Sequence, residues 1–599
     1  MKHFFLKFDL PLKNYKSQTK KSLIKNLFIK KKSIKNEYFF KNNILVISNS
    51  RILNDHSAIS PSRNKINDCE FIYNCYQLGN NTIDKIYGSF AFIIFDINKM
   101  KLFASCDYYH QRPLYYLFNN NKLYFSTNID FILEGIENSM QIDQEIVYDY
   151  LVTGIPRKGR TIYKKINIVP NNYLLEFKNK KIKEIEMCRI DKFYFQRNSN
   201  NYSSKLNQIF SDTLSKQLDY SEDKVAFTLS GGLDSSSIVC TADLLNKNKK
   251  FYTHSWLYKG LKKNQLKRSN EKKFINLVNK KCDVTPCHHI FEKHGPLKII
   301  NETTNFSEPI LGVNIFAPLS VFKRMKKSKI NYLFEGTGGD STISHGTPLF
   351  YELGKKFKLF KLIEQYKIYC DMKKKTYSLF ECLKNYFFKP YLPFISLIRY
   401  RLNNNRNDFF NINIFLKDKN KISVENKIRE ILGYHQTVIN FYKRSIKDYE
   451  LMTAKDGIEA YANRCNYIAA DKYDIETFDP FYNKFMKSFC INVPYRYKLY
   501  NGIDRYYFRE SMKSIIPKEI YERKWKGDMS GIFFNELCST SFHSIEQMVC
   551  ENSSLIKKII SKKKLKAFYF NMKKQNSQKL GVILYKLIYM SIWLKKRGL

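Results

Sequence analysis

Several features that mark secreted, membrane or repeat proteins are missing from this chain of 599 residues. Its 13 cysteines show no framework spacing, which argues against a fold stapled by disulfides. Neither end looks like an export signal or a lipid anchor. The apolar stretch 581–594 is too short to cross a bilayer and contains Lys586, and no internal repeat or heptad stands out. These absences predict a cytoplasmic protein of two packed domains with no membrane span and a packed terminal helix.

Acidic residues are scarce: the chain has 55 of them against 102 lysines and arginines, a net charge of +47. Such a field attracts anions such as ATP, nucleic acid or an acidic leader peptide. Part of the excess has another explanation, because lysine, asparagine, isoleucine and tyrosine are all abundant, as A/T-rich coding produces. No RNA-binding module is recognisable, so we expect no nucleic-acid partner.

The most informative segment is 225–240, where an apolar run stops at Ser-Gly-Gly-Leu-Asp-Ser-Ser and a helix-compatible stretch follows. Its two glycines let the backbone turn and approach an anion, and its serines add hydroxyl donors beside the unpaired N–H groups of a helix start. The acid inside such a loop predicts a Mg²⁺ between carboxylate and phosphate. No Gly-Lys-Ser/Thr follows, so this is not a Walker loop. The predicted nucleotide-binding residues here are Leu229, Ser230, Gly231, Gly232, Asp234, Ser235 and Ser236.

A second loop, at 331–346, repeats the pattern: an apolar strand runs into glycines, including Gly338, and then an acid, Asp340. Strands near 224–229, 251–256 and 331–336 should form a parallel sheet with helices on both faces. Because the carboxyl ends of parallel strands share one crevice, we expect Asp234 and Asp340 to hold one Mg²⁺ together.

The first loop resembles the signature of the PP-loop ATP pyrophosphatases, and the pair of loops resembles the glutamine-dependent asparagine synthetase superfamily. Alternating apolar strands in 86–134, and Asp68-Cys69-Glu70 before them, are similar to the glutaminase domain of that superfamily. The resemblance implies an Ntn-hydrolase-like αββα sandwich over 1–195 and a PP-loop α/β domain over 204–599. A helical insertion is expected at about 350–445, and 198–203 is the expected linker.

Two departures from the family pattern shape the expected activity. Family glutaminases use a cysteine exposed at the N-terminus, whereas residue 2 is Lys2 and the first cysteine is Cys69. The first domain is therefore expected to be a silent scaffold. After Asp340 the chain continues Ser-Thr-Ile-Ser-His-Gly, unlike an ordinary asparagine synthetase. The resemblance then points to lasso peptide cyclases, AMP-forming ligases that use ATP and Mg²⁺ to close an amide ring in a precursor peptide with the help of leader-binding or protease partners.

The C-terminal half supplies further candidates through the same resemblance. Glu476, in a stretch like the family's glutamate before Pro-Phe, maps onto an active-site acid that orients or deprotonates the amine. Lys526 maps onto a cation that stabilises the acyl-adenylate, with Lys524 as its rival. The assisting tyrosine of β-lactam-forming relatives has two loose matches, Tyr442 and Tyr449. The end of the second strand, His254, Ser255 and Trp256, is the expected adenine contact.

Two alternative functions stay open. The chain fits an asparagine synthetase that uses free ammonia, and its basic charge also suits a PP-loop enzyme that modifies RNA. A zinc site at Cys282, Cys287, His288 and His289 fits no usual four-ligand spacing, so buried thiols and a strand-edge histidine pair are the favoured interpretation.

Overall fold

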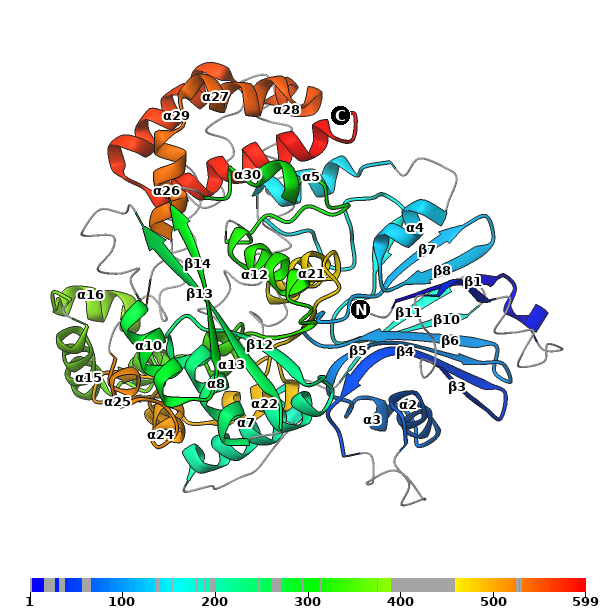
Figure 1. Ribbon diagram of the computed structural model, residues 1–599, viewed down its shortest axis with the longest axis horizontal. Helices are drawn as coiled ribbons and strands as arrows, with labels where there is room; N and C mark the ends of the chain where they lie inside the picture. The colour runs from blue at the N-terminus through cyan, green and yellow to red at the C-terminus, as the bar shows by residue number, and fades with distance from the viewer. Residues whose placement is uncertain are drawn as a thin grey trace.

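The computed structural model shows two domains side by side, with the N-terminal one in blue and cyan (Figure 1). It describes residues 3–15, 27–31, 38–55, 66–135, 141–152, 154–178, 181–187, 190–193, 201–245, 248–259, 271–292, 295–312, 314–373, 375–388, 458–523, 527 and 530–599.

Two antiparallel sheets form the centre of the N-terminal domain, in the orders β2-β1-β8-β7-β9 and β11-β10-β6-β5-β4-β3. Alternation along β1 shows why they stack: Phe4, Leu6 and Phe8 enter the core between the sheets, whereas Phe5 points to the outer helices. The strands are β1 (Phe4–Asp9), β2 (Phe28–Lys31), β3 (Tyr38–Lys41), β4 (Ile44–Ile52), β5 (Gly88–Asp96), β6 (Lys101–Cys106), β7 (Tyr115–Asn119), β8 (Lys122–Ser126), β9 (Ile166–Ile168), β10 (Tyr173–Lys178) and β11 (Lys181–Glu186).

Helices cover both outer faces of this sandwich. The helices α4 (Ile129–Gly135) and α5 (Gln144–Val152) bury their apolar side chains against the first sheet, and α2 (Asp68–Gln77) packs on the second beside α3 (Asn80–Ile83). The expected αββα layering is thereby confirmed. Asp68 begins α2, and its carboxylate accepts from the Ile52 amide at 3.2 Å, so it fastens that helix to β4.

The C-terminal domain is built on a parallel sheet in the order β14-β13-β12-β15-β16. Its strands are β12 (Lys224–Thr228), β13 (Lys250–Lys259), β14 (Thr285–Glu292), β15 (Tyr332–Phe334) and β16 (Glu476–Phe478), so the three strands expected from the sequence are present. Val225 and Phe227 pack into one core and Ala226 into another, because both faces of the sheet are covered as predicted.

One face packs on α7 (Tyr202–Asp219), α8 (Leu233–Leu245), α10 (Lys272–Lys281), α22 (Lys484–Asn492) and α24 (Tyr506–Met512). The other packs on α12 (Phe316–Lys327) and α21 (Ile458–Asp471), as the arrangement in Figure 1 shows. Helix α7 already includes Tyr202 and Ser203, so the linker predicted at 198–203 ends before residue 202. The short helix α6 (Ile190–Phe193) comes before that linker. Short elements complete the domain: α11 (Ile300–Thr303), α13 (Gly339–Ile343), α23 (Tyr495–Lys498), β17 (Leu499–Tyr500), β18 (Ile503–Asp504) and α25 (Lys518–Tyr521).

The insertion predicted at about 350–445 begins with helices at the left of Figure 1, which are α14 (Pro348–Lys355), α15 (Leu359–Met372) and α16 (Leu379–Leu383), followed by a π-helical turn at Lys384–Phe388. Residues 389–457 lie outside the described part. Five helices end the chain at the top of the view: α26 (Ser530–Ser539), α27 (Phe542–Glu546), α28 (Ser554–Ile559), α29 (Lys562–Gln575) and α30 (Gln578–Lys595). The last is the expected packed terminal helix, with Trp593 fully buried. Within the described ranges, no helix is long and apolar enough to cross a membrane.

Candidate active site

A cavity of about 1340 Å³ opens where β12, β13 and β15 end. It lies at the carboxyl edge of the parallel sheet, the place where open α/β sheets bind ligands. Residues from both glycine-rich loops line it, together with Trp256 in β13 and residues 502–505 before α24. The two loops that the sequence singled out therefore face one chamber.

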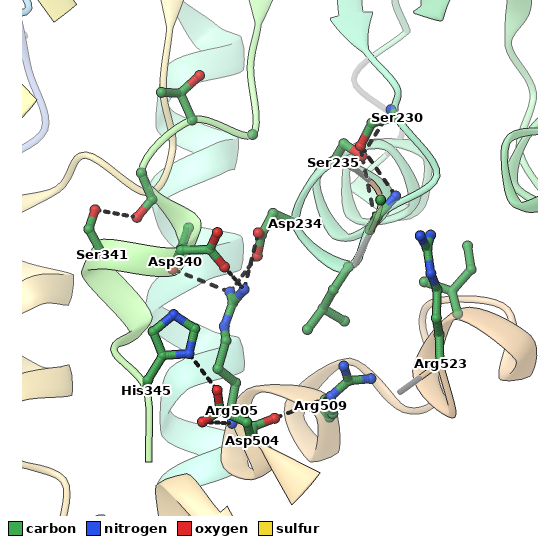
Figure 2. A pocket seen from close by; sticks show the side chains of 18 of the residues that line it. Ser230, Asp234, Ser235, Asp340, Ser341, His345, Asp504, Arg505, Arg509 and Arg523 are labelled. Atoms are coloured by element: carbon green, nitrogen blue, oxygen red, sulfur yellow. Dashed lines mark hydrogen bonds and ion pairs between the residues drawn. The ribbon is translucent and has the colours of Figure 1, made fainter. Parts of the chain in front are cut away.

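The first loop is held by its own side chains. The Ser230 and Ser235 hydroxyls lie 3.1 Å apart, and the Gly232 amide donates to the Ser230 hydroxyl at 3.3 Å (Figure 2). Gly231 has a φ of +74°, and a Cβ there would lie 2.9 Å from the Cβ of Phe274 on α10. Only glycine fits this position, because both the backbone conformation and the neighbouring helix exclude a side chain.

The structure separates the predicted nucleotide-binding residues into two groups. Those that line the cavity are Ser230, Gly232, Asp234, Ser235, Gly338 and Asp340. Those that lie behind it are Leu229, Gly231, Ser236 and Ser255. Ser255 is fully buried and does not line the chamber, whereas its neighbour Trp256 does and donates from Nε1 to the Ala317 carbonyl at 3.1 Å. The contact of adenine with the backbone of His254, Ser255 and Trp256 stays a prediction, and of these three residues Trp256 alone lines the cavity.

The second loop packs directly on the first. A Cβ on Gly339 would lie 2.4 Å from the carboxyl carbon of Asp234, and one on Gly336 would lie 3.0 Å from the Ser235 amide nitrogen. Gly338 has a φ of +83° and lies against the ring of Tyr482. The glycines of this loop are needed because they let the two acids approach each other.

Arg505 lies between the two acids, as Figure 2 shows. Its Nη1 donates to Asp340 Oδ1 at 2.7 Å and to Asp234 Oδ2 at 3.1 Å. Its Nη2 donates to the other oxygen of Asp234 and, at 3.2 Å, to the Gly339 carbonyl. Burial alone would lower the pKa of Arg505, but Asp234 and Asp340 raise it above its ordinary value. The guanidinium thus occupies the point on which the predicted metal ligands converge.

The same donor set fits a magnesium ion. Two carboxylates and a carbonyl oxygen are hard ligands of the kind that Mg²⁺ prefers, and Mg²⁺ commonly takes its remaining ligands from substrate phosphates and water. In the described ranges no cluster of three or more His, Cys, Asp or Glu side chains is placed to hold a metal. Asp234 and Asp340 would therefore hold Mg²⁺ only after Arg505 turns away.

Further basic groups surround the phosphate loop. Arg523 donates to the Gly231 carbonyl at 3.1 Å and pairs with Glu271 at 2.6 Å, with its guanidinium over the Phe274 ring. Arg509 also lines the cavity. Because Arg523 fixes the carbonyl of the loop's tightest turn, it couples the segment after α25 to the geometry of the phosphate loop.

His345 and Asp504 form a pair on the same wall. The His345 ring lies 2.5 Å from the Asp504 carboxylate, and this hydrogen bond raises the pKa of His345 above its ordinary value. The other Asp504 oxygen accepts from the Gly346 amide at 2.7 Å. His345 belongs to the stretch after Asp340 in which the chain departs from the expected pattern, and it ties that stretch to the residues just before Arg505.

A separate group of acids lies on the side formed by β15, β16 and α21. Glu335 and Glu459 line the cavity, and Asp479 is buried behind them. Burial raises the pKa of Glu335 to about 7, although the Asn466 amide donates to it. Burial, followed by Glu335 and Asp107, raises the pKa of Asp479 well above its usual range.

The sequence matches the asparagine synthase family over residues 205–595 and the glutamine amidotransferase domain over residues 53–188. The first match covers more than half of the chain, and it includes both loops and the whole cavity. The chain belongs to the asparagine synthase family.

Three relatives of this asparagine synthase family member span only part of its length. It is 24% identical over 284 residues to a putative asparagine synthetase of Methanocaldococcus jannaschii, covering 46% of this chain and 52% of that one. It is 28% identical to a probable asparagine synthetase of Acanthamoeba polyphaga mimivirus, covering 30% and 32%. It is 27% identical to the amidase chyE of Penicillium rubens, covering 31% and 28%. The chain thus spans about half of the first relative's length and about a third of the others'.

Among solved structures, an allosteric regulatory enzyme of purine biosynthesis aligns with 45% of this chain and 64% of its own, at 11% identity and a TM-score of 0.19. The sheet orders and the packed helices establish the fold of this chain independently of that likeness.

Glu476, which the resemblance maps onto an active-site acid, is engaged by the N-terminal domain in this structure. It begins β16, does not line the cavity, and is buried at the boundary between the domains. Arg112 donates to one of its oxygens and Arg51 to the other at 3.0 Å, and both arginines come from the N-terminal domain. Burial alone would raise the pKa of Glu476, but the two arginines hold it at about 2. In this structure Glu476 joins the two domains, and its role as an active-site acid stays a prediction.

Other predicted residues lie outside the described part of this family member: Lys524, Lys526, Tyr442 and Tyr449. Buried thiols and a strand-edge histidine pair were expected in place of a zinc site, and part of this is seen. The thiols of Cys282 and Cys240 lie 3.5 Å apart in the core. His289, on the edge strand β14, has its Nε2 2.8 Å from Nδ1 of the buried His254.

The sequence patterns did not single out Arg505, Arg523 or Glu335 as residues of the site. Arg505 and Arg523 are two cations in a chain rich in them, and only their partners distinguish them. Glu335 offered a visible signal, because it is a charged residue directly between an apolar strand and a glycine-rich loop.

Proposed function

We propose that this chain is an ATP-dependent amide synthetase that adenylates a substrate carboxylate, releases pyrophosphate and then AMP, and joins the acyl group to an amine. The observation that carries the proposal is the meeting of Asp234 and Asp340, from two glycine-rich loops, in one cavity at the carboxyl edge of the sheet. Membership of the asparagine synthase family supports the same chemistry.

The residues of the cavity divide the work. The amides and hydroxyls of the first loop would bind the β- and γ-phosphates of ATP, with Trp256 beside the base. Asp234 and Asp340 would hold a Mg²⁺ that offsets charge on the leaving pyrophosphate. Arg505, displaced from the two acids, stays close enough to pair with phosphate oxygens as a planar bidentate donor.

We further propose that the substrate carries both reacting groups, as in a ribosomal precursor peptide that closes an amide ring. The cavity of about 1340 Å³ is compatible with this, because pockets for one small molecule usually measure about 300–1,000 Å³ and this one has room for ATP and a second substrate, a peptide segment included. Binding both ends in one chamber makes the amide-forming step intramolecular. A leader-binding protein or protease would act on the same peptide.

The proposal does not require ammonia from the N-terminal domain. The cysteines that the structure describes there, Cys69, Cys75 and Cys106, are all buried. Burial raises the pKa of Cys75 to about 12 and that of Cys106 well above its usual value, so neither is a ready nucleophile. We therefore propose that this domain acts as a scaffold.

A second candidate is asparagine synthesis with free ammonia. It is favoured by the relatives in Methanocaldococcus jannaschii and mimivirus, both described as asparagine synthetases. It uses the same adenylation step and differs in the carboxylate and the amine.

ATP–pyrophosphate exchange with Mg²⁺ tests both candidates. The purified chain is given aspartate with ammonium, aspartate with glutamine, or a candidate precursor peptide with a glycine-led core and an acidic residue. Exchange with the peptide and loss of one water from its mass support ring closure; turnover of aspartate and ammonium supports asparagine synthesis. The variant Asp340→Asn should lose exchange, whereas Asp371→Asn, on the exposed surface of α15, should keep it. Exchange that persists in Asp340→Asn would contradict the assigned site.

A further inference from the structure

Three carboxyl groups come together on the β15–β16 side of the cavity, where the second loop begins. Glu335 follows β15, Asp479 follows β16 and Glu459 lies in the first turn of α21. Glu335 and Glu459 line the cavity, and Asp479 is 4% exposed. Three separate elements therefore bring acids to one wall.

Two of these acids are incompletely hydrogen-bonded. Among the described residues, Glu459 Oε2 and Asp479 Oδ1 are buried and have no hydrogen-bond partner, whereas Glu335 accepts from the Asn466 amide. The strongest charged influences on Asp479 are two further acids, Glu335 and Asp107. A buried carboxyl with an unpaired oxygen is costly, and such an arrangement calls for a donor that is supplied from elsewhere.

The arginines of the cavity are already engaged by other partners. Arg505 is held by Asp234 and Asp340, and Arg523 is held by Glu271 and the Gly231 carbonyl. Arg509 donates to the Asp504 and Tyr521 carbonyls, so Glu335 and Glu459 line a chamber whose arginines are paired with other groups. A group that satisfies these acids has to be a donor and is best positively charged.

We propose that this acidic wall, made of Glu335, Glu459 and Asp479, binds the primary ammonium group of the substrate and that Glu335 accepts its proton. The proposal rests on the proposed function, because it names the site of the amine in that reaction. It assigns to Glu335 the part that the sequence resemblance had given to Glu476.

The geometry around Glu335 suits a base. The Asn466 amide donates to Oε2 and fixes the carboxylate, and the Glu335 amide donates to the Phe478 carbonyl at 2.9 Å, which fixes the backbone. Asp479 lies behind, and Tyr482, which also lines the cavity, packs beside them. Burial of Glu335 disfavours its charged form, so it raises the pKa of Glu335 toward that of a working general base.

The ammonium gives one proton to the Glu335 carboxylate, and the neutral nitrogen attacks the carbonyl carbon of the acyl-adenylate. The C–N bond forms as the C–O bond to the AMP phosphate breaks. The nitrogen loses its second proton to the departing phosphate, from which it passes to solvent.

The variant Glu335→Gln separates this role from the rest of the reaction. ATP–pyrophosphate exchange, which precedes amine attack, should persist, whereas amide formation should fall by about 10²–10⁴-fold. Hydroxylamine, which is unprotonated at neutral pH, should restore acyl transfer in Glu335→Gln because it needs no base. Amide formation at the wild-type rate, or a loss that hydroxylamine does not restore, would overturn the proposal.

A binding measurement separates failure of this site from failure of the proposed function. Calorimetric titration of the full chain with n-butylammonium chloride should show binding that weakens at least about tenfold in Glu335→Gln and in Glu459→Gln. The control Glu364→Gln changes an exposed acid on α15 and should bind as wild type does. Equal binding by all four proteins overturns the ammonium site. Weakened binding together with absent exchange for every carboxylate supports the ammonium site and refutes the adenylation.

Discussion

The guanidinium of Arg505 lies 2.7 Å from Asp340, and the same nitrogen lies 3.1 Å from Asp234. A side chain of the protein therefore holds the position that the two loops prepare for a metal ion. Arg505 donates to both acids in this structure, and under the proposed function it has to move away when Mg²⁺ and ATP bind.

Replacing Arg505 with Gln should change how magnesium affects stability. Without Mg²⁺ the two acids repel each other, so the unfolding free energy should fall by about 2–3 kcal/mol, less than for a fully buried pair because Asp340 is 38% exposed. With Mg²⁺ the loss should shrink, since the ion no longer competes with the guanidinium. Thermal unfolding with and without Mg²⁺ measures both effects, with the exposed Arg496→Gln as control. A magnesium response equal to that of wild type would refute the competition.

Glu476→Gln should weaken the domain boundary. Its pKa is held at about 2 by Arg51 and Arg112, below the ordinary 4.5, so its carboxylate contributes stability that is complete above pH 4.5. That contribution, roughly 3 kcal/mol, is lost as the pH falls from about 4.5 to 2. Urea unfolding at pH 7 and pH 3 should show a large difference between wild type and variant at the higher pH and a smaller one at the lower. The folded fraction of the variant should keep ATP–pyrophosphate exchange. Complete loss of exchange would show that Glu476 takes part in the reaction.

Gly339→Ala should abolish nucleotide activation with little loss of fold. The added methyl group would lie 2.4 Å from the carboxyl carbon of Asp234, so the metal ligand has to move. We expect exchange to fall by at least about 10²-fold, the scale of losing one charge-stabilising contact. Gly312→Ala is the matched control, because the nearest atom to its new methyl group is 4.0 Å away. Full exchange in Gly339→Ala would show that Asp234 does not need its present position.

Glu335→Gln should stabilise the protein at high pH. Burial raises the pKa of Glu335 from 4.5 to about 7, although the Asn466 amide lowers it, and Asp479, Tyr482 and Asp107 lie on the same side. Wild-type stability is therefore full below pH 4.5 and declines as the pH rises through 7. Because the variant cannot ionise, it should exceed wild type by roughly 3 kcal/mol at pH 9 and match it near pH 4. Chemical unfolding at the two pH values measures the difference. If wild type and variant were equally stable at both, the pKa of Glu335 would not be raised in the folded protein.

The two phosphate-facing loops were predictable from local chemistry. An apolar strand, a pair of glycines, an acid and hydroxyls within a few residues are a complete description of such a turn, and Gly231 and Gly338 adopt the positive φ that the pattern requires. The pairing of Asp234 with Asp340 followed from a general rule, since adjacent parallel strands end at the same edge of a sheet. The alternation of apolar and polar residues in the N-terminal strands also predicted its layers, because that alternation is a local property of the sequence.

The other groups were decided by tertiary structure, because their roles depend on partners far along the chain. Arg505 lies 165 residues beyond Asp340, and no local pattern separates it from other arginines. Glu476 sits in a family-like stretch, yet arginines more than 360 residues earlier hold both of its oxygens. Glu335 gains its raised pKa only when α21 and β16 close over it. Sequence alone thus determined the loops, whose geometry is short-range, whereas the charges around them were set by long-range burial and pairing.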